Sequence, residues 1–296
     1  MRSRYLFPAL VLGLAACGGG PDKGAQAPAD ELVIGGEPAV VSSLYQMPTP
    51  NELFGLVKQL AGEGHKRMLN PASNVDRYVT IKSRAINFGV YATDLVYASS
   101  FKLNVEVARY YLTSKKLAEA LGINSAFSDA DFVRLESNLA KGDSLEVISN
   151  DAYQRAYEKM QSEQMGPVLS MVLAGGWLES MHLVVRQIEA FGKNEQLMAR
   201  VAEQKVTLEH LLSMMEAYRS DANVEAIYTQ LATIRDIYDG LNVTRMAHAG
   251  ASSTGRMVLG DDVTMQMTDA KYTELVQAVD RLRSEWTKPE DAPQAQ

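Results

Sequence analysis

The sequence predicts an all-α fold, a multi-helix bundle or array of about 8–10 helices with a small β-hairpin near residues 256–267. Apolar residues recur at spacings of three and four along most of the chain, which is typical of amphipathic helices. Glycine, proline and small polar residues separate these stretches at short intervals. The alternation of apolar and polar residues that marks half-buried strands is almost absent.

The first residues predict an export signal. Arg2 and Arg4 supply positive charge, residues 5–14 form a short apolar run, and Ala15 and Ala16 are small enough for a peptidase pocket. The apolar run is too short to span a bilayer stably. We therefore expect residues 1–17 to be a signal peptide and not part of the fold.

Cys17 is the only cysteine of the chain. The sequence Leu14-Ala15-Ala16-Cys17 resembles the lipobox of bacterial lipoproteins. The resemblance implies acyl chains such as palmitate on Cys17, and hence a lipid-anchored protein of the cell envelope with the membrane as a partner. Several chains would anchor the protein where one would not. Gly18, not aspartate, follows the cysteine, which by resemblance to enterobacterial sorting implies the outer membrane. A plain signal peptide with a chance cysteine is the alternative.

The mature chain divides into a tether, a helical domain and a tail. Residues 18–36 and 288–296 are rich in glycine, proline, alanine and charge, so we expect a flexible tether and a disordered tail. Residues 37–287 form the domain, which could consist of two related halves that meet near residues 142–165. The formal charge of −7 argues against a nucleic-acid partner, because such partners require clustered lysine and arginine.

The helices can be placed from their apolar spacing and their end signals. Thr49 and Pro50 start a first helix, which Gly62 ends, and Pro71 starts a second helix that we expect to continue to Phe101. The remaining helices are expected at 104–121 with Asn104 as its cap, 128–141, 144 or 150 to 164, 167–191, 194–218, 223–241 and 268–286.

Residues 242–267 interrupt the helical pattern, and their second half favours two short strands. A connection of this length is typical of a functional or mobile loop. Arg245, His248 and Arg256 flank or follow a run of small polar residues, so cations and backbone amides could converge on an anion there. They are candidate ligand contacts, and an ordered segment or mobile loop without chemistry is the alternative. The residues that a phosphate loop or a nucleophile elbow requires are missing.

Residues 84–101 predict a helix that is apolar nearly all the way round, yet five polar side chains recur at spacings of three and four. These side chains therefore share one helix face. They are Arg84, Asn87, Tyr91, Asp94 and Tyr97. If this face is buried, Asp94 must be paired, because an isolated buried carboxylate costs several kcal/mol or takes up a proton.

Residues 167–191 have the same character, with Trp177, Glu179, His182 and Arg186 embedded in an apolar helix. Glu179 and His182 have the spacing of ligands in carboxylate-bridged dimetal bundles. The second Glu-x-x-His of such bundles is absent, so we predict no metal and no cofactor and favour a buried structural network.

The two apolar helices also share a pattern of glycine, aromatic and polar residues. Gly89, Tyr91 and Asp94 can be aligned with Gly175, Trp177 and Ser180. A duplicated unit whose central helices pack through the glycines would account for it, and chance similarity is the alternative. Tyr91 and Trp177 are further candidate ligand contacts.

The sequence thus predicts a lipid-anchored envelope protein that acts as a binding or accessory subunit, with an envelope protein as its partner. An envelope enzyme that uses Asp94, Glu179 and His182 for general acid–base catalysis is one alternative. A purely structural lipoprotein is the other.

Overall fold

The computed structural model describes residue 54 and residues 63–138, 145–191, 195–247 and 261–290. The signal peptide with Cys17, the tether and nearly all of the first expected helix lie outside the described residues. His248, Arg256 and most of the expected tail lie outside them as well.

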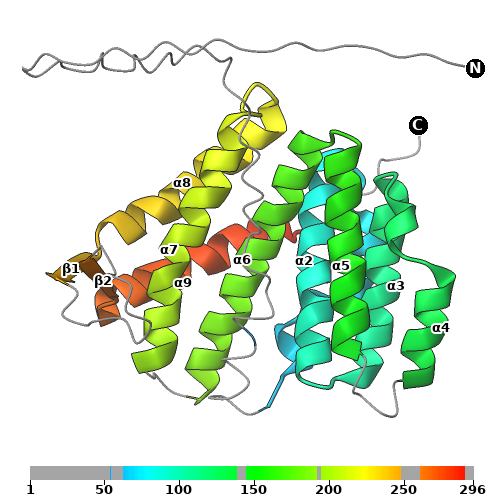
Figure 1. Cartoon of the computed structure of the whole chain (residues 1–296), viewed down its shortest axis with the longest axis horizontal. Coiled ribbons are helices and arrows are strands. Elements are labelled where there is room, and N and C mark those ends of the chain that lie inside the picture. Colours follow the sequence, from blue (N-terminus) through cyan, green and yellow to red (C-terminus); the bar gives the residue numbers. More distant parts are fainter. Residues whose placement is uncertain (1–53, 55–62, 139–144, 192–194, 248–260, 291–296) are drawn as a thin grey trace, which may run out of the picture. The chain divides into compact units, whose positions relative to one another are not determined.

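The described residues form an array of α-helices, as the sequence predicts (Figure 1). The α-helices are α2 (Ile81–Ser100), α3 (Asn104–Ala120), α4 (Asp129–Asn138), α5 (Leu145–Ser162), α6 (Gly166–Phe191), α7 (Glu195–Glu216), α8 (Ala222–Asp239) and α9 (Asp269–Trp286). Three short 3₁₀ helices accompany them: η1 (Lys66–Met68), η2 (Ala72–Arg77) and η3 (Asn124–Ala126).

The helices α2 and α6 lie side by side and make the most extensive packing of the array (Figure 1). The helices α3 and α5 pack on α2, whereas α7, α8 and α9 pack on α6. Over Gly166–Glu189, α6 is long and apolar enough to cross a membrane, but 94% of its most apolar window is buried inside the structure. It therefore forms part of the core of the array.

Glycines let the backbones of α2 and α6 touch. A Cβ atom on Gly89 would lie 2.0 Å from the carbonyl oxygen of Val172, and one on Gly175 would lie 2.1 Å from the carbonyl oxygen of Ile86. Each glycine thus faces the carbonyl three residues before the other glycine, so the contact is reciprocal. Any larger residue at either position would force the two helices apart.

Two details of the helix starts differ from the expectation. The predicted helix from Pro71 to Phe101 is broken, because Thr80 caps α2 by accepting a hydrogen bond from the Ser83 amide (3.1 Å). Asn104 is not the cap of α3, since Leu103 holds that position without a side-chain bond. The tight turn before it, with Lys102 at a φ of 56°, brings Asn104 into the first helical turn instead.

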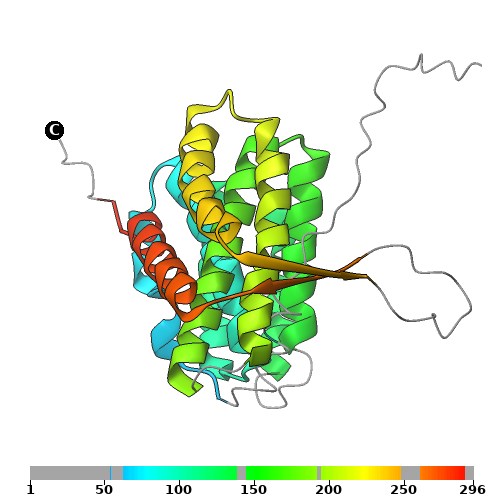
Figure 2. The same ribbon diagram turned by 90° about the vertical axis from the view of Figure 1, so that its left-hand side faces the viewer.

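The hairpin exists, but its strands pair differently from the expectation. Strand β1 (Asn242–Ala247) pairs antiparallel with β2 (Asp261–Gln266), and the two run out from the helices as a ribbon (Figure 2). Only β2 lies in the range where both strands were expected, because its partner lies before the small polar run and not after it.

Candidate functional site

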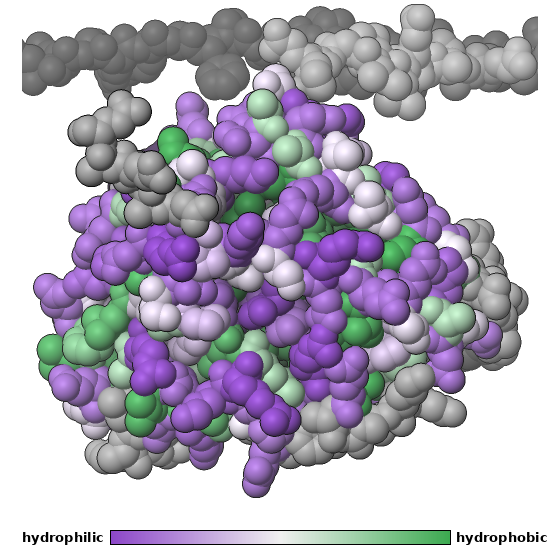
Figure 3. Space-filling view, turned by 180° about the vertical axis from the view of Figure 1, so that it is seen from behind, coloured by the Kyte–Doolittle hydropathy of each residue, from purple (hydrophilic) through white to green (hydrophobic). Residues whose placement is uncertain are grey.

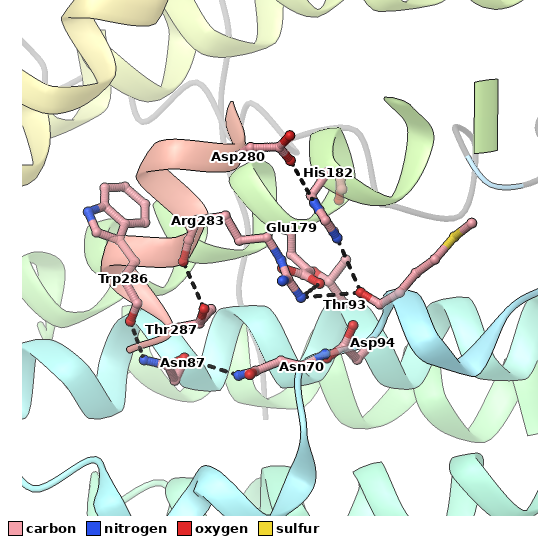
Figure 4. A network of polar contacts seen from close by, with 12 residues as sticks. Asn70, Asn87, Thr93, Asp94, Glu179, His182, Asp280, Arg283, Trp286 and Thr287 are labelled. Carbon is pink, nitrogen blue, oxygen red and sulfur yellow. Dashed lines mark hydrogen bonds and ion pairs between the residues drawn. The ribbon is translucent and has the colours of Figure 1, made fainter. Parts of the chain in front are cut away.

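Two carboxyl groups meet an arginine inside the array (Figure 4). Asp94 comes from α2, Glu179 from α6 and Arg283 from α9, and both carboxylic side chains are 0% exposed. Arg283 donates from Nε to Glu179 Oε2 (2.6 Å) and from Nη2 to Oε1 (2.7 Å). Such a bidentate pair fixes the guanidinium and satisfies both oxygens of Glu179.

The surroundings shift the pKa of Asp94 well above 3.8. Burial is the main cause, and the neighbouring Glu179 carboxylate adds to it more than Arg283 offsets it. Oδ2 of Asp94 accepts a hydrogen bond from the Asn70 amide (3.0 Å), whereas Oδ1 is buried and accepts none from the described residues. The raised pKa favours the protonated form of Asp94, so we expect the pair to hold one proton and one negative charge opposite Arg283.

The polar face of α2 binds the chain segment that precedes the helix, residues 65–78, which we call the strap. All five predicted polar residues of that face hydrogen-bond to it. The bonds are Arg84 Nε to Tyr78 O (3.1 Å), Asn70 Nδ2 to Asn87 Oδ1 (3.4 Å), Tyr91 OH to Pro71 O (2.8 Å), Asn70 N to Asp94 Oδ2 (3.0 Å) and His65 N to Tyr97 OH (3.0 Å). The polar face of α2 thus supplies hydrogen-bond partners to a segment of irregular backbone.

The other helices hold the strap from the opposite side. The carbonyl oxygen of Met68 accepts from Arg283 Nη2 (3.3 Å) and lies 3.2 Å from His182 Nε2. Because a carbonyl only accepts, Nε2 must be the donating nitrogen of His182. Tyr110 OH of α3 donates to the carbonyl oxygen of Asn70 (2.7 Å). Strap residues therefore join four helices.

His182 links this network to the surface. Its side chain is 10% exposed, and its Nδ1 lies 3.4 Å from Asp280 Oδ1 of α9. Asp280 also accepts from Arg186 of α6. Burial alone would raise the pKa of Asp280, but the neighbouring His182 and Arg186 side chains hold it below its usual range. His182 thus connects the Met68 carbonyl with Asp280, which also binds Arg186.

An open cleft of about 430 Å³ lies beside His182. Its lining residues are Arg67, Met68, His182, Arg186, Glu189 and Arg283. Neither Asp94 nor Glu179 lines it. Three arginines and Glu189 therefore line the cleft, whereas the two buried carboxyl groups do not reach it.

The arrangement is built to stabilise more than to transfer protons. General acid–base catalysis requires a group within hydrogen-bond reach of a substrate, and both oxygens of Glu179 are used by Arg283. Within the described part of the chain, no group of three or more histidine, cysteine or acidic side chains could hold a metal ion. Glu179 and His182 instead contact Arg283 and the Met68 carbonyl.

The other candidate ligand contacts do not come together at this cleft. Tyr91 is buried and binds the strap, and Trp177 is buried with its Nε1 unbonded to any described residue. Arg245 lies on β1. His248, Arg256 and the lipidation candidate Cys17 lie outside the described residues.

Sequence reasoning missed Arg283, Asn70 and Asp280. A signal for Arg283 exists, because it occupies a buried stripe of α9 with Val276, Val279 and Trp286 at spacings of three and four. A charged residue on such a stripe indicates a buried partner. Asn70 has no comparable signal, since the strap lacks a periodic pattern.

Comparison with protein-family models, curated proteins and solved structures found no match for this chain.

Proposed function

We propose that this chain is a lipid-anchored protein of the bacterial cell envelope, most consistent with the outer membrane, and that it acts as a binding or accessory subunit and not as an enzyme. The observation that favours a binding role over catalysis is that Asp94 and Glu179 both make structural contacts. Asp94 bonds the strap, Glu179 bonds Arg283, and neither lines the cleft, so neither is presented to a substrate there.

The proposed attachment rests on the lipobox resemblance at Cys17 and on the character of the surface. The face seen in Figure 3 is largely hydrophilic, with apolar residues scattered over it and not gathered into one broad patch. Such a face offers no area by which the domain itself would enter a bilayer. Acyl chains on Cys17 would supply the attachment instead, at roughly 0.8 kcal/mol for each buried methylene.

The attachment is tested by mass spectrometry of the mature polypeptide from a bacterial envelope fraction. We expect the chain to begin at Cys17 and to carry the added mass of diacylglycerol and fatty acid. In the Cys17→Ser variant we expect the modification to be lost and the protein to leave the membrane fraction. Processing at another position, or an unmodified thiol on Cys17, would overturn the proposal.

The binding role is tested with Asp94→Asn and Glu179→Gln. From a structural network we expect Glu179→Gln to lose stability, and we expect neither variant to lose the cellular phenotype selectively. A variant that folds with wild-type stability but loses the phenotype would instead indicate a reaction centre.

A further inference from the structure

We infer that the cleft beside His182 binds a small polar ligand through a single carboxylate group. This inference rests on the proposed binding role and names the class of ligand. At about 430 Å³, the cleft lies within the usual size range of small-molecule sites. Among the described residues, Met68 is its one apolar lining residue, so the cleft suits a hydrophilic ligand better than a lipid chain.

Among the described residues that line the cleft, one cation has no anion paired with it. Arg186 is paired with both Asp280 and Glu189, and Arg283 is paired with Glu179. Arg67 lies exposed on the strap and forms no ion pair or hydrogen bond with any described residue. One unpaired positive charge matches a ligand with one negative charge.

Arg283 supplies a second donor that is already held in place. Its Nε and Nη2 are bonded to Glu179 and the Met68 carbonyl, and its Nη1 donates to none of the described residues. Arg283 also lines the cleft. Because Glu179 fixes its position, Arg283 would lose little side-chain entropy when it binds a carboxylate oxygen.

The same charges disfavour a dianion. Glu189 lines the cleft. Glu189 and Asp280 are the two anionic partners of Arg186, which also lines it. A second negative charge on the ligand would meet these carboxylates without a free cation to offset them. We therefore expect a monocarboxylate to bind more tightly than phosphate at about pH 8, where phosphate is mainly the dianion.

The test uses the mature chain in detergent at about pH 8 and constant ionic strength, with acetate and gluconate as monocarboxylate probes and inorganic phosphate as the comparison. Ring resonances of His182, assigned with the His182→Gln variant, report on the cleft. We expect saturable shifts with the monocarboxylates and a phosphate affinity lower by about tenfold. Absence of saturation, or equal affinity for phosphate, would overturn the inference.

The variant Arg67→Ala removes the unpaired cation, which is exposed and makes no bond to the described residues, so folding should be unaffected. We expect affinity for the monocarboxylates to fall by about five- to tenfold. The matched control is Arg200→Ala, which removes an equal charge from an exposed pair with Glu203 on α7. Equal losses in the two variants would reveal a general charge effect and contradict a site. The lipid on Cys17 is measured separately by mass, so failure of the attachment and failure of the cleft can be told apart.

Discussion

At the scale of single residues, the pairing of Glu179 with Arg283 dominates the interior. Both partners are largely withdrawn from water, with side chains 0% and 15% exposed. Burial on its own would lower the pKa of Arg283, yet the adjacent carboxylate raises it above its ordinary value. Each charge therefore depends on the other, and removing one leaves its partner buried and unpaired.

We predict that Glu179→Gln lowers the free energy of unfolding by about 3–5 kcal/mol, the usual cost of breaking a buried ion pair from one side. Chemical denaturation measures it. Glu203→Gln removes a carboxylate from the exposed pair with Arg200 and should cost about 1 kcal/mol or less. Similar values for the two variants would show that Glu179 is not a buried partner.

The raised pKa of Asp94 gives stability a pH dependence of known sign. The folded chain holds the proton more tightly than the unfolded chain, where the pKa is near 3.8. The contribution of Asp94 is therefore fully present below that value and is lost as pH rises through the higher pKa of the folded state. In this window, the free energy of unfolding should decline with increasing pH.

Asp94→Asn should remove that decline. Asparagine has the shape of the neutral acid, can accept from the Asn70 amide and can donate to Glu179. We predict that the difference in unfolding free energy between the variant and the wild type grows in favour of the variant from about pH 4 to about pH 8. Parallel pH profiles for the two proteins would contradict the assignment.

At the scale of elements, the contact between α2 and α6 depends on two glycines. We predict that Gly89→Ala and Gly175→Ala each cost about 3 kcal/mol or more, because the added methyl group would meet helix backbone that cannot rotate away. Gly176→Ala is the control on the same helix. Its Cβ would lie 3.3 Å from Thr93 Oγ1, so a small shift suffices and better helix propensity offsets it. Thermal unfolding of the three variants checks the order, and equal effects would refute the close approach.

The elements were predictable to the extent that their signals are local. Apolar spacing and end residues placed α4 after Ser128 and α9 after Thr268, and both residues accept a bond from the third amide of their helix. The polar face of α2 was also legible, since five polar side chains at helical spacing must share a side. The segment that this face binds could not be predicted, because the strap has no periodic pattern.

The candidate site was harder to predict because its contacts span long stretches of sequence. Glu179 lies 104 positions before Arg283, and the Met68 carbonyl lies 215 positions before it. A buried carboxylate indicates that a partner exists, but it does not identify which basic residue is that partner. The pairing of β1 with β2 was missed for the same reason, since register is set by partners outside the local pattern.

At the scale of the whole described structure, one polar centre joins elements that lie far apart in the sequence. Asn70 lies on the strap, Asp94 on α2, Glu179 on α6 and Arg283 on α9 (Figure 4). The centre is neutral only if one of the two carboxyl groups carries a proton. A neutral centre can tie the strap, α2, α6 and α9 together without an uncompensated buried charge.

The protonation state of Asp94 tests this account most directly, and infrared spectroscopy of the folded chain near neutral pH measures it. We predict a carbonyl band of a protonated carboxylic acid that disappears in Asp94→Asn and is absent from the urea-unfolded wild type at the same pH. If the folded wild type lacks that band, or if it persists in Asp94→Asn, the buried acid pair does not share a proton and the central claim is wrong.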